Sequence, residues 1–325
     1  MSAFGGKATF LSVLRISISD YFSLRIFAAL IGEAVMTLVY RYYDQAELER
    51  QLNARATVPD ITPILARYTA ESARVRARLR CRLAVSYGAS EPERLDIFPS
   101  ATSELSPIFV FIHGGYWRLL DSADSCFMAE HLTQAGACVV AVNYALAPIV
   151  TLAEITRQCR AAVAWVHAHA RQFGGDPARI HVCGSSAGGH LAAMMLVPGW
   201  EAGFGVPNNL VAGATLLSGL YDLEPVRLGH PNEWLKLSTA DVATFSPLLH
   251  MPERAVRLVV SYAPSETDEF KRQSETYMAA AVARGCPVRF VAMPGTNHYD
   301  LVFGLAQRES PLAKVVLETM GLHNP

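Results

Sequence analysis

The 325-residue sequence lacks the charge imbalance that is typical of proteins that bind polyanions. Its 28 Lys and Arg residues nearly balance its 29 Asp and Glu residues, giving a formal net charge of −1, and no block of basic residues interrupts the chain. A nucleic acid partner requires a basic patch or stripe. The composition therefore excludes nucleic acid and favours a small-molecule substrate, and it leaves a homodimer open as the assembly.

Cysteine pairs with C-x-x-C spacing are also missing. The six cysteines are scattered, and several lie inside apolar runs, as buried free thiols do; they are Cys81, Cys126, Cys138, Cys159, Cys183 and Cys286. A reducing cytoplasm is the compartment that this usage favours.

No clean membrane-spanning run or small-residue cleavage site is found before residue 43. The stretch 22–40 is largely apolar, but Arg25 and Glu33 interrupt it, so it falls short of a typical span. We predict that residues 1–42 form an N-terminal extension of uncertain structure. A membrane partner is not expected, although a peripheral anchor is an alternative for this segment.

Apolar residues make up 51% of the chain, which is ample for one large domain. We predict one domain over residues 43–325, with a helical collar at 43–80 and a cap insertion at 223–253. Strand and helix signals alternate after the collar, and crossovers of this length require a mostly parallel sheet flanked by helices. The predicted strands cover residues 82–87, 94–98, 107–112, 137–143, 180–183, 211–217, 256–262 and 288–293, and the long helices cover 152–173 and 270–284.

The stretch from Ile180 to Leu191, I-H-V-C-G-S-S-A-G-G-H-L, predicts a strand that turns sharply into a helix. Gly184 and Gly188 lie two residues before and after Ser186, which is the G-x-S-x-G pattern of a nucleophile elbow. Such a turn strains the central serine and exposes its hydroxyl, and the following helix directs N–H groups at an oxyanion. Ser186 is therefore the predicted nucleophile; a glycine-rich turn with an inert serine is the alternative.

A second glycine pair follows the predicted strand 107–112, in the segment H-G-G-Y-W at 113–117. Two glycines at that point let the backbone present N–H groups to a cavity. In hydrolases with an elbow, such a loop and the residue after the nucleophile form the oxyanion hole. We predict that its donors are Gly114, Gly115 and Ala187. Tyr116 and Trp117 are predicted to wall the substrate pocket, with core packing as the alternative, and Tyr221 is predicted to contact the substrate.

His298 lies after the last predicted strand, where elbow hydrolases place their catalytic histidine. A neutral imidazole there can accept the proton of the serine and later protonate the leaving group. The acid is expected after a late strand, and Glu266 is our choice because it lies closest to the strand end. Asp268 is the second choice, and Asp222 is equally typical of a cap or turn residue.

Six segments together resemble arylformamidase (kynurenine formamidase)-like α/β-hydrolases, which are related to hormone-sensitive-lipase-like esterases. They are H-G-G-Y-W at 113–117, V-N-Y-A-L-A-P at 142–148, G-S-S-A-G-G-H-L at 184–191, S-G-L-Y-D-L-E-P at 218–225, E-T-D-E-F-K-R-Q-S at 266–274 and N-H-Y-D at 297–300. The resemblance implies an α/β-hydrolase fold with an eight-stranded sheet.

It also implies a serine hydrolase, without metal or cofactor, that cleaves N-formylkynurenine to kynurenine and formate. The family's triad maps onto Ser186, Glu266 and His298. The chain departs from the family at Ser185, where histidine is usual, and at Glu266, where aspartate is frequent. A carboxylesterase for short-chain or aryl esters would use the same triad, and a non-catalytic binding protein on this fold is a third hypothesis.

Overall fold

The computed structural model describes residues 37–102 and 105–323. The chain divides into two units, Met1–Gln45 and Ala46–Pro325. In the first unit, Tyr40 and Tyr43 form an isolated antiparallel bridge, and the rings of Tyr42 and Tyr43 meet edge to face. Most of the predicted N-terminal extension lies outside the described residues. Within those residues, no helix has the length and hydropathy needed to cross a bilayer.

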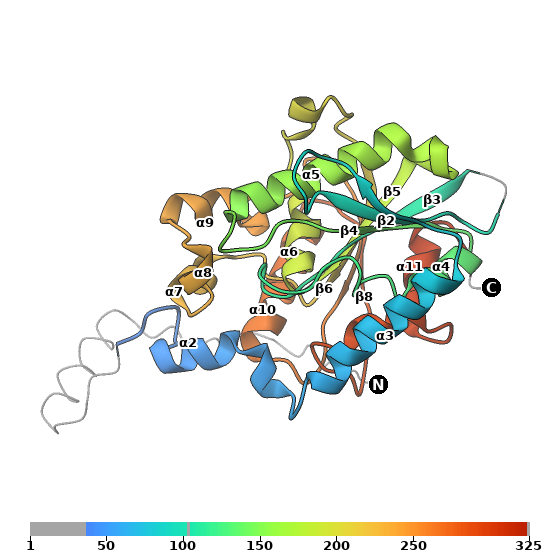
Figure 1. The fold of residues 1–325 in the computed structure, drawn as a ribbon. Helices are drawn as coiled ribbons and strands as arrows, with labels where there is room; N and C mark the ends of the chain where they lie inside the picture. Colours follow the sequence, from blue (N-terminus) through green and yellow to red (C-terminus); the bar gives the residue numbers. More distant parts are fainter. Residues whose placement is uncertain (1–36, 103–104, 324–325) are drawn as a thin grey trace, which may run out of the picture. The chain divides into compact units, whose positions relative to one another are not determined.

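The second unit contains an eight-stranded sheet in the order β1-β2-β4-β3-β5-β6-β7-β8 (Figure 1). Strands β1 and β2 pair antiparallel, β2 pairs antiparallel with β4, and the remaining neighbours are parallel. The strands are β1 Arg82–Ser86, β2 Arg94–Phe98, β3 Ser106–Ile112, β4 Cys138–Val142, β5 Gly175–Ser185, β6 Val211–Leu217, β7 Arg257–Ser261 and β8 Val288–Phe290. The predicted mostly parallel, eight-stranded α/β-hydrolase fold is confirmed.

Helices cover both faces of this sheet, with α3 and α5 on opposite sides (Figure 1). The α-helices are α2 Gln45–Leu52, α3 Thr62–Arg78, α4 Ala129–Gln134, α5 Leu152–His169, α6 Ala187–Met194, α7 Glu224–Leu228, α8 Asn232–Leu235, α9 Thr239–Phe245, α10 Asp268–Ala283 and α11 Pro311–Thr319. Short 3-10 helices are η1 Ala54–Thr57, η2 Ala170–Phe173, η3 Glu201–Phe204, η4 Pro247–Leu249 and η5 Leu301–Ala306.

The central strands are apolar along their whole length because helices bury both faces of the sheet. Strands β3 and β4 are fully buried. Alternate side chains from these strands, Phe109, Phe111 and Val139, join one core cluster with residues of α3, α4 and α11. On the other side, α6 contacts β3, β5 and β6. All six cysteines are free thiols and five are buried, as expected; the cytoplasmic location stays a prediction.

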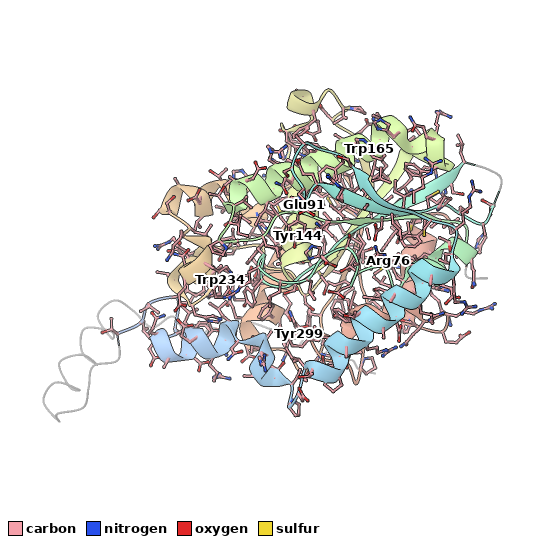
Figure 2. All side chains as sticks on the ribbon, in the orientation of Figure 1. Arg76, Glu91, Tyr144, Trp165, Trp234 and Tyr299 are labelled. Atoms are coloured by element: carbon pink, nitrogen blue, oxygen red, sulfur yellow. The ribbon has the colours of Figure 1, made fainter. Side chains whose placement is uncertain are left out.

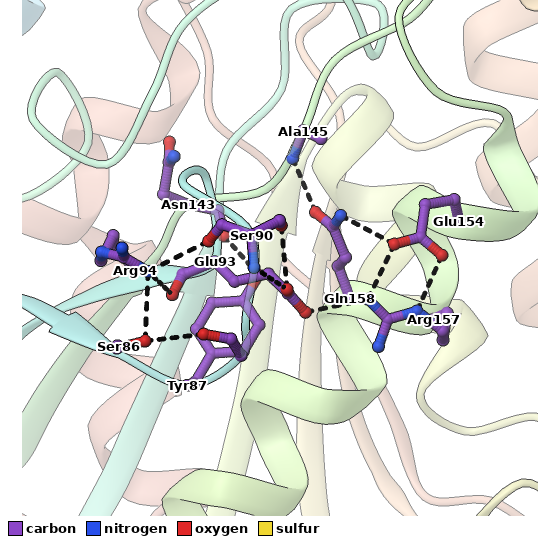
Figure 3. Close-up of polar contacts among 11 residues, drawn as sticks. Ser86, Tyr87, Ser90, Glu93, Arg94, Asn143, Ala145, Glu154, Arg157 and Gln158 are labelled. Carbon is purple, nitrogen blue, oxygen red and sulfur yellow. Dashed lines mark hydrogen bonds and ion pairs between the residues drawn. The ribbon is translucent and has the colours of Figure 1, made fainter.

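A partly buried polar network ties the loop that follows β4 to α5 (Figure 3). Glu93 accepts hydrogen bonds from Ser90 and pairs with Arg157 of α5 at 2.8 Å. One helix position further on, Gln158 Oε1 accepts the N–H of Ala145 at 2.7 Å. The network therefore anchors residues 143–148 to α5, and this loop contacts the predicted site.

Candidate active site

The G-x-S-x-G segment forms a sharp strand-to-helix turn. Strand β5 ends at Ser185, α6 begins at Ala187, and Ser186 between them has φ 58° and ψ −122°. A Cβ at Gly184 would lie 2.0 Å from the carbonyl oxygen of Gly188, and a Cβ at Gly188 would lie 2.0 Å from that of Ile112. Side chains at these two positions would clash with backbone, so the strained turn requires both glycines.

His298 lies next to the serine although 112 residues separate them in the sequence. The distance from His298 Nε2 to Ser186 Oγ is 3.0 Å, and both side chains are buried. The ring of Phe270 meets the imidazole edge to face, with centroids 4.7 Å apart. The 3.0 Å distance between Nε2 and Oγ is within the range for direct proton transfer from Ser186 to His298.

The carboxylate of Glu266 faces the other ring nitrogen of His298. Glu266 Oε2 is 3.6 Å from Nδ1, and both side chains are almost completely shielded from solvent. Glu266 Oε1 accepts hydrogen bonds from the Ser218 hydroxyl at 2.5 Å and from the Ala263 N–H at 2.9 Å. One oxygen is thus fixed by two donors, and the other is left to face the imidazole. The hydrogen bond from Ser218, which directly follows β6, was not predicted from the sequence.

The other two carboxylates considered for this role lie elsewhere. Asp268 is the first residue of α10, its side chain is 79% exposed, and its nearest cation is Lys271 at 3.9 Å. Asp222 lies 3.6 Å from Arg272. The structure therefore brings Glu266, and neither aspartate, to His298.

The loop at 113–117 packs against the elbow. A Cβ at Gly114 would lie 2.6 Å from the Ser185 carbonyl oxygen and 3.3 Å from Ser186 Cβ, and Gly115 has φ +93°, a conformation that favours glycine. Ala187 is the first residue of α6, so its N–H has no partner within the helix. The three predicted oxyanion donors thus come from two segments that meet beside Ser186.

Tyr144 stabilises the loop at 113–117 through two contacts with His113. Its ring stacks on His113 at 4.1 Å with a 6° angle, and its hydroxyl donates to the His113 carbonyl oxygen at 2.8 Å. Ala147, in the same loop after β4, donates its N–H to the Trp117 carbonyl oxygen at 2.8 Å. Burial lowers the pKa of His113 to about 4, so this imidazole is neutral, and its Nδ1 donates to the Gly114 carbonyl oxygen at 3.0 Å.

A cavity of about 430 Å³ opens beside Ser186 and His298. Its wall combines residues of the collar, of the loop after β3, of the cap and of the segment around His298; these include Arg55, Leu65, Tyr68, Phe111, Tyr116, Arg118, Phe127, His230, Trp234, Tyr299 and Val302. Figure 2 marks Trp234 in α8 and Tyr299 close to α3. A second cavity, of about 370 Å³ near Arg254, contains none of the predicted site residues.

The structure corrects two of the three predicted substrate contacts. Tyr116 lies on the cavity wall, but Trp117 and Tyr221 do not. Trp117 is fully buried and meets His190 edge to face at 5.2 Å. Its ring also meets that of Tyr116 edge to face, with centroids 6.0 Å apart, so Tyr116 lies between Trp117 and the cavity wall residue Trp234, which its ring contacts at 6.0 Å. Tyr221 is fully buried as well and stacks on Tyr277 of α10 at 4.4 Å.

His190, which lies on α6 just past the elbow, belongs to the packing beneath the site. It is completely buried, its Nε2 lies 2.8 Å from the Phe245 carbonyl oxygen, and burial lowers its pKa to about 4. Across the described ranges 37–102 and 105–323, no three His, Cys, Asp or Glu side chains are grouped so that they could hold a metal ion.

Comparison with known proteins gives a consistent result. The BD-FAE family matches residues 95–205. Kynurenine formamidase of Danio rerio is 34% identical over 255 residues, which cover 76% of this chain and 85% of the relative, and that of Drosophila melanogaster is 26% identical over 68% and 75%. Carboxylesterase NlhH of Mycobacterium tuberculosis is 41% identical over 100 residues, which cover 30% of this chain and 31% of the relative.

Solved structures extend the similarity to the fold. A putative thioesterase from Silicibacter sp. TM1040 superimposes with a TM-score of 0.73 at 27% identity, over 83% of this chain and 98% of that one. An esterase from Pyrobaculum calidifontis gives a TM-score of 0.64 at 21% identity, over 84% and 97%, which shows the fold alone. The chain is a hydrolase and belongs to the kynurenine formamidase-like family of α/β-hydrolases.

Proposed function

We propose that this chain is a serine hydrolase that converts N-formylkynurenine to kynurenine and formate. The observation that carries the proposal is the 3.0 Å distance between Ser186 Oγ and His298 Nε2, with Glu266 Oε2 3.6 Å from Nδ1 on the far side of the ring. Similarity to relatives named kynurenine formamidase supports the choice of substrate.

In the first step, the Ser186 oxygen attacks the formyl carbon and its proton moves to His298 Nε2. The electron pair of the carbonyl moves onto the formyl oxygen, which becomes an oxyanion. The N–H groups of Gly114, Gly115 and Ala187 then donate hydrogen bonds to it, and one such donor contributes on the order of 3 kcal/mol to transition-state stabilisation. The carboxylate of Glu266 stabilises the imidazolium that forms.

In the second step, the tetrahedral intermediate collapses and the bond from the formyl carbon to the aryl nitrogen breaks. The proton on His298 Nε2 moves to that nitrogen, so kynurenine leaves as a neutral aryl amine and a formyl ester remains on Ser186. A water molecule gives a proton to Nε2 and attacks the ester carbon. The proton on Nε2 then moves to the Ser186 oxygen as its bond to the formyl carbon breaks, formic acid leaves and ionises to formate in water, and the starting state is restored.

A carboxylesterase acting on short-chain or aryl esters is the second candidate. The observation that favours it is the cavity of about 430 Å³ with a mostly apolar wall, which has more room than a formyl group needs. The same steps would apply, with an alcohol or phenol as the leaving group.

The two candidates differ in their tolerance of the acyl group. We expect efficient turnover of N-formylkynurenine, and a loss of about 10–200-fold in kcat/KM for each carbon that lengthens the acyl group, because a tight acyl pocket excludes it. The measurement compares kcat/KM for N-formylkynurenine, 4-nitrophenyl acetate and 4-nitrophenyl butyrate, with Ser186→Ala as the blank. Good turnover of the butyrate with none of the formamide would overturn the first candidate in favour of the second.

A further inference from the structure

The cavity beside Ser186 carries positive charge on its wall without a matching acid. Arg55 and Arg118 line it, and none of its wall residues is Asp or Glu. In the described part of the chain, neither guanidinium is within ion-pair distance of a carboxylate; the surface arginines of α3 and α5, in contrast, are paired. A cleft lined by one sign of charge raises the local concentration of ligands of the opposite sign.

Arg118 is an exposed residue that contacts the cap through a cation–π interaction. Its guanidinium lies 4.4 Å from the centroid of the Trp234 ring in the cap. Trp234 is itself fixed, because its Nε1 donates to the Tyr116 carbonyl oxygen at 3.0 Å, and the Tyr116 hydroxyl donates to the Leu52 carbonyl oxygen at 2.5 Å. Stacking uses the face of the guanidinium and leaves the N–H groups on its edge available for an anion.

A different part of the same wall is apolar. Tyr68 of α3 and Phe127 lie with their ring centroids 5.2 Å apart, and Leu65 and Val302 belong to the same wall. The Tyr68 hydroxyl donates to the Tyr299 carbonyl oxygen, which ties α3 to the segment that carries His298. The cavity thus combines an aromatic, apolar section with the cationic section at Arg118 and Trp234.

We propose that this cavity selects aryl substrates that carry a carboxylate, and that Arg118 is the residue that recognises the carboxylate, assisted by Arg55. The proposal rests on the proposed function, because it takes this cavity as the place where Ser186 acts. An aromatic ring fits the apolar section, and a carboxylate can accept two parallel hydrogen bonds from one guanidinium. The carboxylate of the substrate therefore determines specificity without taking part in the bond cleavage.

The kinetic test uses two chromogenic esters with the same acyl group, 3-carboxy-4-nitrophenyl acetate and 4-nitrophenyl acetate. We measure the ratio of their kcat/KM values in the wild type and in Arg118→Met, so that the intrinsic reactivity of the two leaving groups cancels. The ratio should fall about tenfold in Arg118→Met, and Arg118→Lys should recover part of it, since lysine keeps the charge but loses the planar fork. Arg171→Met, a matched exposed arginine in η2 away from the cavity, should leave the ratio unchanged.

A binding measurement separates this proposal from the proposed function. Benzoate and benzamide have nearly the same shape and differ in charge, and their affinity for Ser186→Ala can be measured by calorimetry without any turnover. Benzoate should bind about tenfold more tightly than benzamide, and the difference should disappear in the Ser186→Ala, Arg118→Met double variant. Equal affinities would overturn the charge selection even if the enzyme is active, and a retained preference in an enzyme that cleaves no ester or formamide would support it while the proposed function fails.

Discussion

The elbow and the cavity wall are built in different ways. The elbow occupies a few consecutive residues, and its geometry follows from the sterics of Gly184 and Gly188 against the backbone. The cavity wall is assembled from segments spread from residue 52 to residue 302. Local sterics therefore determine where the nucleophile lies, but long-range packing determines what can reach it. The position of the nucleophile can therefore be predicted from a short motif, but the residues of the cavity wall cannot.

The largest expected effect tests the elbow. Ser186→Ala should reduce kcat by about 10⁵–10⁶-fold, because alanine has no oxygen that could attack the substrate, and binding of substrate should be largely retained. His298→Ala should cause a loss of similar size, and the double variant should be little worse than either single variant. Single-turnover kinetics with N-formylkynurenine would measure this, and strictly additive losses would contradict a Ser186–His298 pair that acts as a unit.

The next largest loss of kcat is expected on substitution of the triad acid, Glu266. Glu266→Gln should reduce kcat by about 10³–10⁴-fold, because an amide cannot stabilise the imidazolium as a carboxylate does. Asp268→Asn is the matched control, since Asp268 lies on the same segment but is exposed and faces Lys271. Steady-state kinetics on both variants should show a large loss only for Glu266→Gln. Equal losses would remove Glu266 from the proposed triad.

The third prediction concerns Tyr144, which supports the loop at 113–117 between the elbow and the cavity. The variant is Tyr144→Phe. Loss of its hydroxyl leaves the His113 carbonyl oxygen without this donor and should lower kcat about tenfold with little change in KM, less than the 10²–10³-fold typical for loss of one oxyanion donor. Tyr87→Phe is the control, because it removes a hydrogen bond of similar length, to the Asn143 carbonyl oxygen at 2.7 Å, away from the loop at 113–117. Both variants should lose about 1 kcal/mol of stability. A purely structural role for Tyr144 would lower kcat equally in both.

The smallest effect concerns stability and pH. Burial lowers the pKa values of His113, His181 and His190 to about 4 each. Below about pH 6.5 the unfolded chain binds protons at these sites that the folded chain does not, so the free energy of unfolding should fall as the pH drops from 7 to 5. Each histidine contributes up to about 1.4 kcal/mol per pH unit in this window.

Chemical denaturation at several pH values measures that slope. His181→Asn, in β5 away from the cavity, should make this slope measurably smaller, and His323→Gln, an exposed control, should leave it unchanged. A slope that does not respond to His181→Asn would contradict its neutral, buried state.

Much of the fold could be predicted because periodicity and turn residues act locally. Most strand limits agree to within about two residues with the structure, but β5 begins at Gly175 instead of residue 180. A register shift between β3 and β5 lets the strand begin early, at Ser106 and Gly175, and no apolar run marks it. At the sheet edge, β8 ends at Phe290 instead of residue 293, because it has only β7 as a neighbour.

The candidate site was predictable where a motif fixes position and unpredictable where only packing does. The structure brings together Ser186, Glu266 and His298 as the sequence indicated. It places Trp117 in the core, where its ring packs against His190 instead of lining the cavity. The contact between Arg118 and Trp234 was not predicted, since 115 residues lie between them in the sequence.

The central claim is that the hydroxyl of residue 186 is activated by the imidazole of residue 298. Its most direct measurement is covalent modification by a fluorophosphonate, followed by intact mass and peptide mapping. We expect one adduct per chain, located on Ser186, and a rate of modification that falls by several orders of magnitude in His298→Ala. A folded wild-type protein that stays unmodified, or an adduct on another residue, would contradict it.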